Sequence, residues 1–120
     1  MRMGVLGALL GAVAVAAGAF GAHGLRERLD PASMATFETA VRYQLVHTIA
    51  LIVAAQRGTQ HPGRAVSMAG GLFVAGIVLF SGSLYALAFG APHALGVITP
   101  FGGLSFIAGW VALAVSFGGK

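Results

Sequence analysis

Residues 3–22 read MGVLGALLGAVAVAAGAFGA and contain no charged side chain. As a helix with a rise of about 1.5 Å per residue, this run is about 30 Å long, which matches the hydrocarbon core of a bilayer. The apolar core of a secretory signal peptide is shorter, about 7–15 residues. We therefore interpret residues 3–22 as a membrane-spanning helix rather than a cleaved signal.

The composition of the whole chain agrees with a membrane protein. Of its 120 residues, 58% are hydrophobic and 8% are charged, whereas soluble domains have about 25% charged residues. The net charge of +4 comes from basic residues that stand singly between apolar runs, so they form no basic patch for nucleic acid. The chain has no cysteine, which excludes disulfides, thiolate metal ligands and cysteine nucleophiles.

Three further apolar runs follow the first one, at residues 43–56, 65–89 and 100–117. Between the first and second runs lies segment 25–42, which holds six of the ten charged residues: Arg26, Glu27, Arg28, Asp30, Glu38 and Arg42. Asp30-Pro31 has the residue types of a helix start, and apolar residues recur after it at helical spacing. The sequence thus predicts an all-α membrane protein with one domain over residues 1–120. Its four transmembrane helices form two hairpins, with an amphipathic interfacial helix at 25–42.

Basic residues in the connections suggest an orientation. With four spans, Arg2, Arg57, Arg64 and Lys120 share one side of the membrane, and Arg26, Arg28 and Arg42 share the other. The positive-inside rule favours the side with more Lys and Arg. We therefore expect a multi-pass protein of the bacterial inner membrane with both termini in the cytoplasm. The count of four against three also leaves a dual topology open.

Small residues recur along the apolar runs and predict close helix contacts. The candidate packing positions are Gly7, Gly11, Gly18 and Gly82. Small residues let helix backbones approach closely inside a membrane. They could pack the helices of one chain together, which we favour, or join copies in a homo-oligomer.

A second set of residues is polar although it lies in the apolar runs. This candidate intramembrane cluster comprises Gln44, His47, Thr48, Ser81, Ser83 and Tyr85. Polar groups at this depth must face protein or a water-filled cavity, so we expect hydrogen bonds between helices or a lined pathway. Three histidines, His23, His47 and His93, are expected toward the same side of the membrane, and the sequence leaves open whether they converge.

Residue blocks spread along the chain resemble one known family. They are the stretches GAFGAHGL at 18–25, YQ at 43–44 with His47, FSGSLY at 80–85, ITPFGG at 98–103 and GW at 109–110. In these blocks the chain resembles the domain of unknown function 423 family, also called the YgdD and transmembrane protein 256 family. The resemblance covers nearly the whole length and implies a small four-helix integral membrane protein. It supplies no assigned role and no active site.

Motifs of soluble enzyme chemistry are absent from the sequence. No P-loop, GxSxG, HExxH or CxxC occurs, and each of these motifs would place a phosphate site, a nucleophile or a metal. We therefore expect a protein that is not an enzyme and needs no cofactor or metal. Its expected partners are the lipid bilayer and either a second copy or another membrane protein, and no nucleic acid. The favoured role is a helical-bundle accessory or scaffold protein, and the alternative is a small oligomeric transporter or channel for a neutral or lipid-like ligand.

Overall fold

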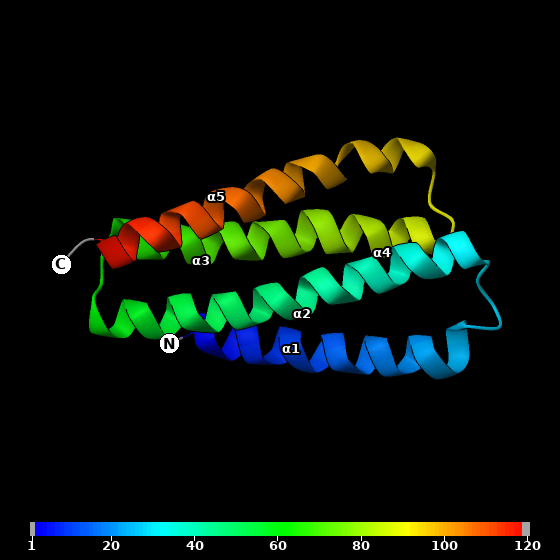
Figure 1. Ribbon diagram of the computed structural model, residues 1–120, viewed down its shortest axis with the longest axis horizontal. Coiled ribbons are helices and arrows are strands. Elements are labelled where there is room, and N and C mark those ends of the chain that lie inside the picture. The colour runs from blue at the N-terminus through cyan, green and yellow to red at the C-terminus, as the bar shows by residue number, and fades with distance from the viewer. Residues whose placement is uncertain (1, 119–120) are drawn as a thin grey trace.

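The computed structural model describes residues 2–118, and all regular elements in this part of the chain are helices joined by short turns. Four helical rods run back and forth along its long axis (Figure 1). The elements in order are α1 (Arg2–Phe20), η1 (Gly21–Leu25), α2 (Pro31–Gln60), α3 (Arg64–Gly76), η2 (Ile77–Ser81), α4 (Gly82–Ala88), η3 (His93–Val97) and α5 (Thr99–Gly118). The π-helical turn η1 continues α1, and the π-helical turn η2 joins α3 to α4 in one rod. The all-α prediction is confirmed.

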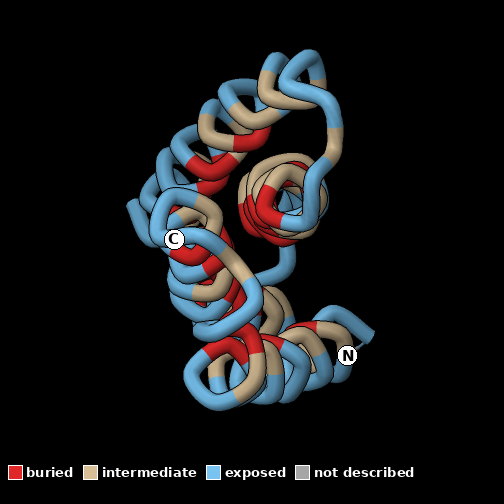
Figure 2. Tube along the Cα trace, turned by 90° about the vertical axis from the view of Figure 1, so that its right-hand side faces the viewer, coloured by how far each residue is buried: buried red, intermediate tan, exposed pale blue. Residues whose placement is uncertain are grey.

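The rods pack in the order α1, α2, α3 with α4, and α5. Helix α1 packs on α2, α2 packs on the α3–α4 rod, and α5 packs on α3 and η2. Figure 2 shows α1 at one edge of the assembly and α5 at the opposite edge. The Cα extents of 50 × 27 × 18 Å describe a flattened bundle. The start of α1 and the end of α5 lie at the same end of it (Figure 1), as two hairpins require.

Helix α2 begins at the predicted place. Asp30 caps it, because one carboxylate oxygen accepts a hydrogen bond of 2.7 Å from the backbone N–H of Ser33, and Pro31 takes the first helical position. The hydrogen bonds from Ser33 also lower the pKa of the exposed Asp30 carboxyl. The helix then runs without interruption to Gln60. The interfacial helix expected at 25–42 is therefore not a separate element, since residues 31–42 are the first turns of α2.

The first turns of α2 are held in the bundle by a small apolar cluster. Leu25, Met34, Phe37 and Ala88 are buried together. Because Met34 and Phe37 of α2 are buried together with Leu25 of η1 and Ala88 of α4, the segment continues the bundle instead of lying apart from it. Its charged residues are all exposed.

Three helical stretches are long and apolar enough to cross a membrane: Arg2–Leu25, Arg64–Ala88 and His93–Gly118. Helix α2 does not meet this criterion, although it lies between α1 and the α3–α4 rod. The position of α2 in the bundle explains why it can be less apolar than the other three. A central helix is covered by protein on several sides, so it can carry polar residues such as Gln44 and His47 that a lipid-exposed helix could not.

The turn after α4 depends on a glycine. Gly90 has a φ of 101°, a backbone conformation that other residues rarely adopt. It ends α4 with two reverse hydrogen bonds, from Gly90 N–H to the Leu87 carbonyl and from Ala91 N–H to the Ala86 carbonyl. This pattern is a Schellman motif. It turns the chain toward η3 and thereby sets the start of α5.

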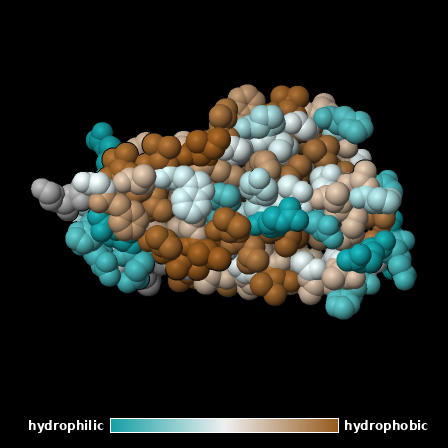
Figure 3. Space-filling model, viewed as in Figure 1, coloured by the Kyte–Doolittle hydropathy of each residue, from teal (hydrophilic) through white to brown (hydrophobic). Residues whose placement is uncertain are grey.

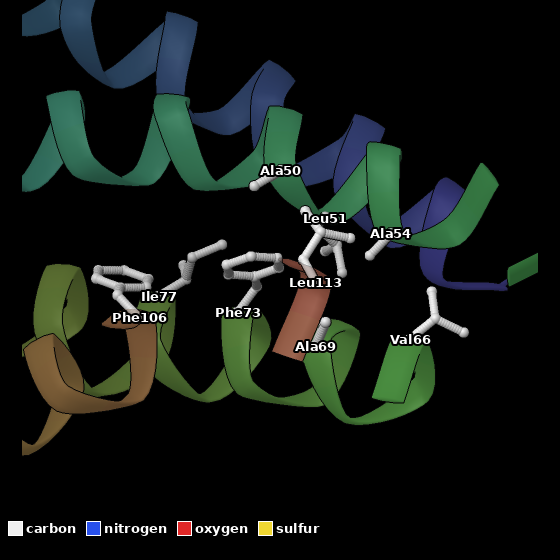
Figure 4. Close-up of a cluster of buried hydrophobic side chains, with 9 residues drawn as sticks. All are labelled: Ala50, Leu51, Ala54, Val66, Ala69, Phe73, Ile77, Phe106 and Leu113. Carbon is white, nitrogen blue, oxygen red and sulfur yellow. The ribbon is translucent and has the colours of Figure 1, made fainter. Parts of the chain in front are cut away.

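The main apolar core lies between α2, α3 and α5 (Figure 4). Phe73 and Leu51 are fully buried at its centre, and Phe106 and Leu113 enter it from α5. Large apolar residues elsewhere are exposed, mainly on α1, α2 and α5. Figure 3 shows broad apolar areas on one face of the molecule, a hydrophilic group near the centre of that face, and further hydrophilic residues toward the two ends. This distribution is the one expected of a protein surrounded by lipid.

Candidate functional site

The polar residues of α2 face the interior of the bundle. Gln44 is 3% exposed, His47 5% and Thr48 1%. They fall at helical spacings of three and four residues, so one face of α2 carries all three. The surrounding helices supply their partners.

Gln44 connects three helices. Its side-chain amide donates a hydrogen bond of 2.8 Å from Nε2 to the backbone carbonyl of Leu10 in α1. Its Oε1 accepts one of 2.7 Å from the hydroxyl of Tyr85 in α4. Both ends of the amide are therefore engaged, and the bonds link α1 to α4 through α2.

His47 is engaged at both ring nitrogens. The indole N–H of Trp110 in α5 donates to its Nε2 at 3.0 Å. Because Nε2 then acts as an acceptor, the proton of a neutral ring is on Nδ1, which donates to the Tyr43 carbonyl at 2.7 Å. The imidazole stacks on Phe106, with ring centroids 3.6 Å apart and planes within 11°. His47 thus joins α2 to α5 by one hydrogen bond and one ring stack.

The hydroxyl groups of the predicted cluster are each bonded locally or to a neighbouring helix. Ser81, in η2, donates to the Ala40 carbonyl of α2 at 2.8 Å. Ser83 is bonded to the Thr99 hydroxyl at the start of α5 and to the Phe80 carbonyl. Thr48 bonds to the Leu45 carbonyl of its own helix. The six residues thus form several separate contacts within residues 2–118, where the bond between Gln44 and Tyr85 is the only hydrogen bond that joins two of them, and of the six only His47 lines the groove described next.

A groove lies on the face between α2 and α5. It has a volume of about 640 Å³ and is lined mainly by aromatic and aliphatic side chains: Tyr43, His47, Phe80, Pro100, Gly103, Leu104, Phe106, Ile107 and Trp110. Of the predicted polar cluster, only His47 lines it. In Figure 1, α2 and α5 lie on either side of the α3–α4 rod.

The predicted packing glycines divide into two groups. A side chain at Gly7, Gly11 or Gly18 would meet α2, with nearest atoms in Ile52, Thr48 and Val41 at 2.8, 3.5 and 3.4 Å. These three glycines therefore serve the contact between α1 and α2 inside one chain. Gly82 is exposed, and a Cβ there would meet only a backbone oxygen of its own rod at 4.0 Å. It packs against no other helix.

The histidines do not form a metal centre in the part of the chain that the structure describes. Within residues 2–118 no group of three or more histidine, aspartate or glutamate residues could hold a metal ion together. His23 lies in η1 and His93 begins η3, both exposed, whereas His47 is buried in α2. His47 also has no free lone pair, because Trp110 occupies it.

Several structural residues were not identified in the sequence. Gly76, Gly102 and Gly109 form the tight contact between the α3–α4 rod and α5, where each faces a phenylalanine. Ser105 donates from α5 to the Leu72 carbonyl at 2.7 Å. Arg57, assigned only to a loop, donates to the Ser116 carbonyl at 2.7 Å and lies over the Phe117 ring. A cation at the C-terminal end of a helix is favoured by the helix dipole, so Arg57 fastens α2 to the end of α5.

Comparisons with known proteins identify relatives of the whole chain. The family model described as "Protein of unknown function (DUF423)" matches residues 17–103. A UPF0382 membrane protein of Staphylococcus haemolyticus is 48% identical over 93% of this chain and 91% of its own length. The UPF0382 membrane protein YwdK of Bacillus subtilis is 42% identical over 93% and 92%. One from Haemophilus influenzae is 45% identical over 89% and 86%. No solved structure matches the chain.

Proposed function

The chain belongs to the DUF423 family of membrane proteins of unknown function, and from this premise we propose that it is a non-enzymatic accessory or scaffold protein of the bacterial inner membrane. In this proposal α2 is a fourth membrane crossing. Both termini lie in the cytoplasm, and the charged end of the bundle around residues 26–42 lies on the opposite side.

The observation that carries the proposal is the pairing of the polar groups inside the bundle. Gln44, His47 and Ser81 bond to other helices, and each bond holds two rods together. A transport pathway needs polar groups that face an open cavity and can exchange partners with a substrate. The groups of this bundle instead bond to one another or to backbone carbonyls, which favours a rigid structural body over a small transporter or channel.

The surface offered to a partner is the charged end. Arg26, Glu27, Arg28, Glu38 and Arg42 are all exposed there. The spans themselves present mainly apolar side chains, which are matched to lipid. Residues 26–42 are therefore where a partner outside the membrane core would distinguish this protein from other bundles.

The test is the size of the particle that the protein forms at its natural level in the membrane. After extraction in digitonin, we expect a tagged chain to elute with a second protein in fixed ratio. Reversing Arg26 and Arg28 to glutamate should release that protein. The matched control is Arg64→Glu, a charge reversal at the other end of the bundle, which should leave the complex intact. A wild-type chain that elutes without any other protein contradicts the accessory role.

The proposed orientation has its own test. Reporters fused after residue 120 should give a cytoplasmic signal, and reporters inserted at residue 28 a signal from the other side. Equal signals on both sides from one fusion contradict the single orientation and indicate dual topology.

A further inference from the structure

The groove between α2 and α5 has features that the scaffold role does not use. Its α5 wall runs from Pro100 to Trp110, which is about 15 Å along a helix. It starts at the first residues of α5 and continues to the middle of that helix. Its volume of about 640 Å³ lies within the range of pockets for small molecules, about 300–1,000 Å³.

Three of the rings that line the groove share an orientation, while Phe80 and Trp110 are inclined to them by 42° or more. Tyr43 and His47 are stacked within 11° of parallel, as are His47 and Phe106. Tyr43 and Phe106 lie within 22° of each other. Aromatic rings pair best in offset stacks with centroids about 4.5–7 Å apart. A flat ring that enters the groove can extend this set, whereas a flexible acyl chain gains nothing from the common orientation.

One hydrogen-bond donor of the groove is unused. The other polar side chains of α2 at this depth, Gln44, His47 and Thr48, are bonded. The Tyr43 hydroxyl makes no hydrogen bond with any residue from 2 to 118, and its side chain is 41% exposed. A donor beside an apolar groove is best satisfied by an acceptor on the molecule that fills it.

We propose that this groove binds a membrane-soluble molecule with a flat conjugated ring that carries carbonyl oxygens, of the lipid-quinone class. The ring stacks on Tyr43, the exposed member of the parallel set, and a carbonyl oxygen accepts a hydrogen bond from the Tyr43 hydroxyl. An apolar tail leaves the groove sideways past Leu104 and Ile107, which are 61% and 62% exposed. This inference is independent of the scaffold role, since binding requires neither a partner protein nor transport.

The chain contains a natural reporter for this site. Trp110 is its only tryptophan and lines the groove, and quinones quench indole fluorescence on contact. The protein is reconstituted in phosphatidylcholine vesicles and titrated with decylubiquinone. We expect quenching that saturates at low quinone content. Quenching that only rises linearly with quinone in the membrane would overturn the proposal.

A relocated reporter separates specific binding from collisions in the bilayer. The double variant Trp110→Phe and Phe20→Trp places the tryptophan on α1, where residue 20 is 56% exposed and outside the groove. Its quenching should be linear. If it saturates at the same quinone content as the wild type, the groove is not the site.

Substitutions of its lining residues test the groove itself. Gly103→Leu should fill it and abolish saturation, and a Cβ at Gly103 has only ordinary contacts with Phe80, at 3.9 Å or more, so the fold should persist. If the Gly103→Leu variant does not fold, Ile107→Phe takes its place, because a larger side chain there narrows the groove from the same helix. Tyr43→Phe removes the free hydroxyl and should weaken binding about fivefold, as expected for one hydrogen bond. Unchanged quenching in both the filled and the hydroxyl-free variant would overturn the assignment.

The ligand class is tested by competition. Decylbenzene has a ring and tail but no carbonyl oxygen, and we expect it to displace decylubiquinone poorly. Equal displacement would show a groove that accepts any apolar ring or chain, and would overturn the proposed class of ligand.

Discussion

Two helix contacts of this bundle are built on glycine, and they use it in different ways. Between α1 and α2, Gly7, Gly11 and Gly18 lie against side-chain atoms of α2. Between the α3–α4 rod and α5, Gly102 lies against the backbone of Phe80 itself, and Gly109 receives the ring of Phe73. In the first contact glycine lets two helices approach each other. In the second, each glycine leaves the space that a phenylalanine occupies. The second contact should therefore tolerate change least.

The largest expected effect is at Gly102. A Cβ there would overlap the backbone nitrogen of Phe80 and come within 2.7 Å of its Cα. Since backbone atoms cannot move aside as a flexible side chain can, we expect Gly102→Ala to destabilise the bundle by about 3 kcal/mol. The measurement is unfolding by SDS in mixed micelles, followed by Trp110 fluorescence.

The neighbouring glycine is the matched control for this effect. At Gly103 the nearest atoms to a Cβ belong to the Phe80 ring, at 3.9 Å. Gly103→Ala should be neutral or stabilise the helix by up to about 1 kcal/mol. Equal loss of stability in the two variants would contradict the idea that backbone contact makes the α5 interface rigid.

Gln44 gives the next largest effect, because it joins the α1 edge to the rest of the bundle. Gln44→Leu removes the bonds to the Leu10 carbonyl and the Tyr85 hydroxyl. Buried hydrogen bonds in membrane proteins contribute about 0.6–1.7 kcal/mol each, so we expect a loss of about 1–2 kcal/mol. In a double-mutant cycle with Tyr85→Phe, the two changes should not be additive. Full additivity would mean that the two side chains do not interact.

The glycine contacts and the buried Gln44 show what the sequence could predict. The helical class and the three long spans follow from apolar runs, and the inward direction of Gln44 and His47 follows from the high cost of polar groups in lipid. The glycines of α1 were identified because their spacings of four and seven residues place them on one face. Gly76, Gly102 and Gly109 were not identified, because their role depends on which phenylalanines α5 meets. That information lies in the crossing of two helices and not in either one.

The interfacial helix at 25–42 was inferred because the sequence does not show which residues pack against this segment. Six charged residues close together favour water locally, and only the tertiary structure shows that Met34 and Phe37 find a buried place beside Ala88. The polar cluster was likewise predicted as one site. Each member faces protein, yet their partners lie on different helices. Sequence spacing gives the face of a residue but not its neighbour.

A third prediction tests the contact between α1 and α2, where side chains can shift. At Gly7 a Cβ would lie 2.8 Å from Cγ1 of Ile52, a side chain of α2 that is 40% exposed and able to shift. We expect Gly7→Ala to cost about 1 kcal/mol, clearly less than Gly102→Ala. Gly11→Ala, whose nearest contact is 3.5 Å, is the control and should be neutral. A loss at Gly7 as large as that at Gly102 would remove the distinction between the two contacts.

The smallest effect is expected where glycine meets nothing in the chain. Gly71 has no atom within 4 Å of a Cβ, and Gly82 has only a backbone oxygen of its own rod at 4.0 Å. Gly71→Leu and Gly82→Leu should therefore change the stability of the bundle by less than about 0.5 kcal/mol. The informative measurement is the oligomeric state in vesicles, by energy transfer between labelled copies. If the small residues of this exposed face join two copies, leucine there will separate them while each bundle stays folded. If energy transfer is unchanged, Gly71 and Gly82 do not join two copies, and the glycine contacts that stabilise the bundle lie inside one chain.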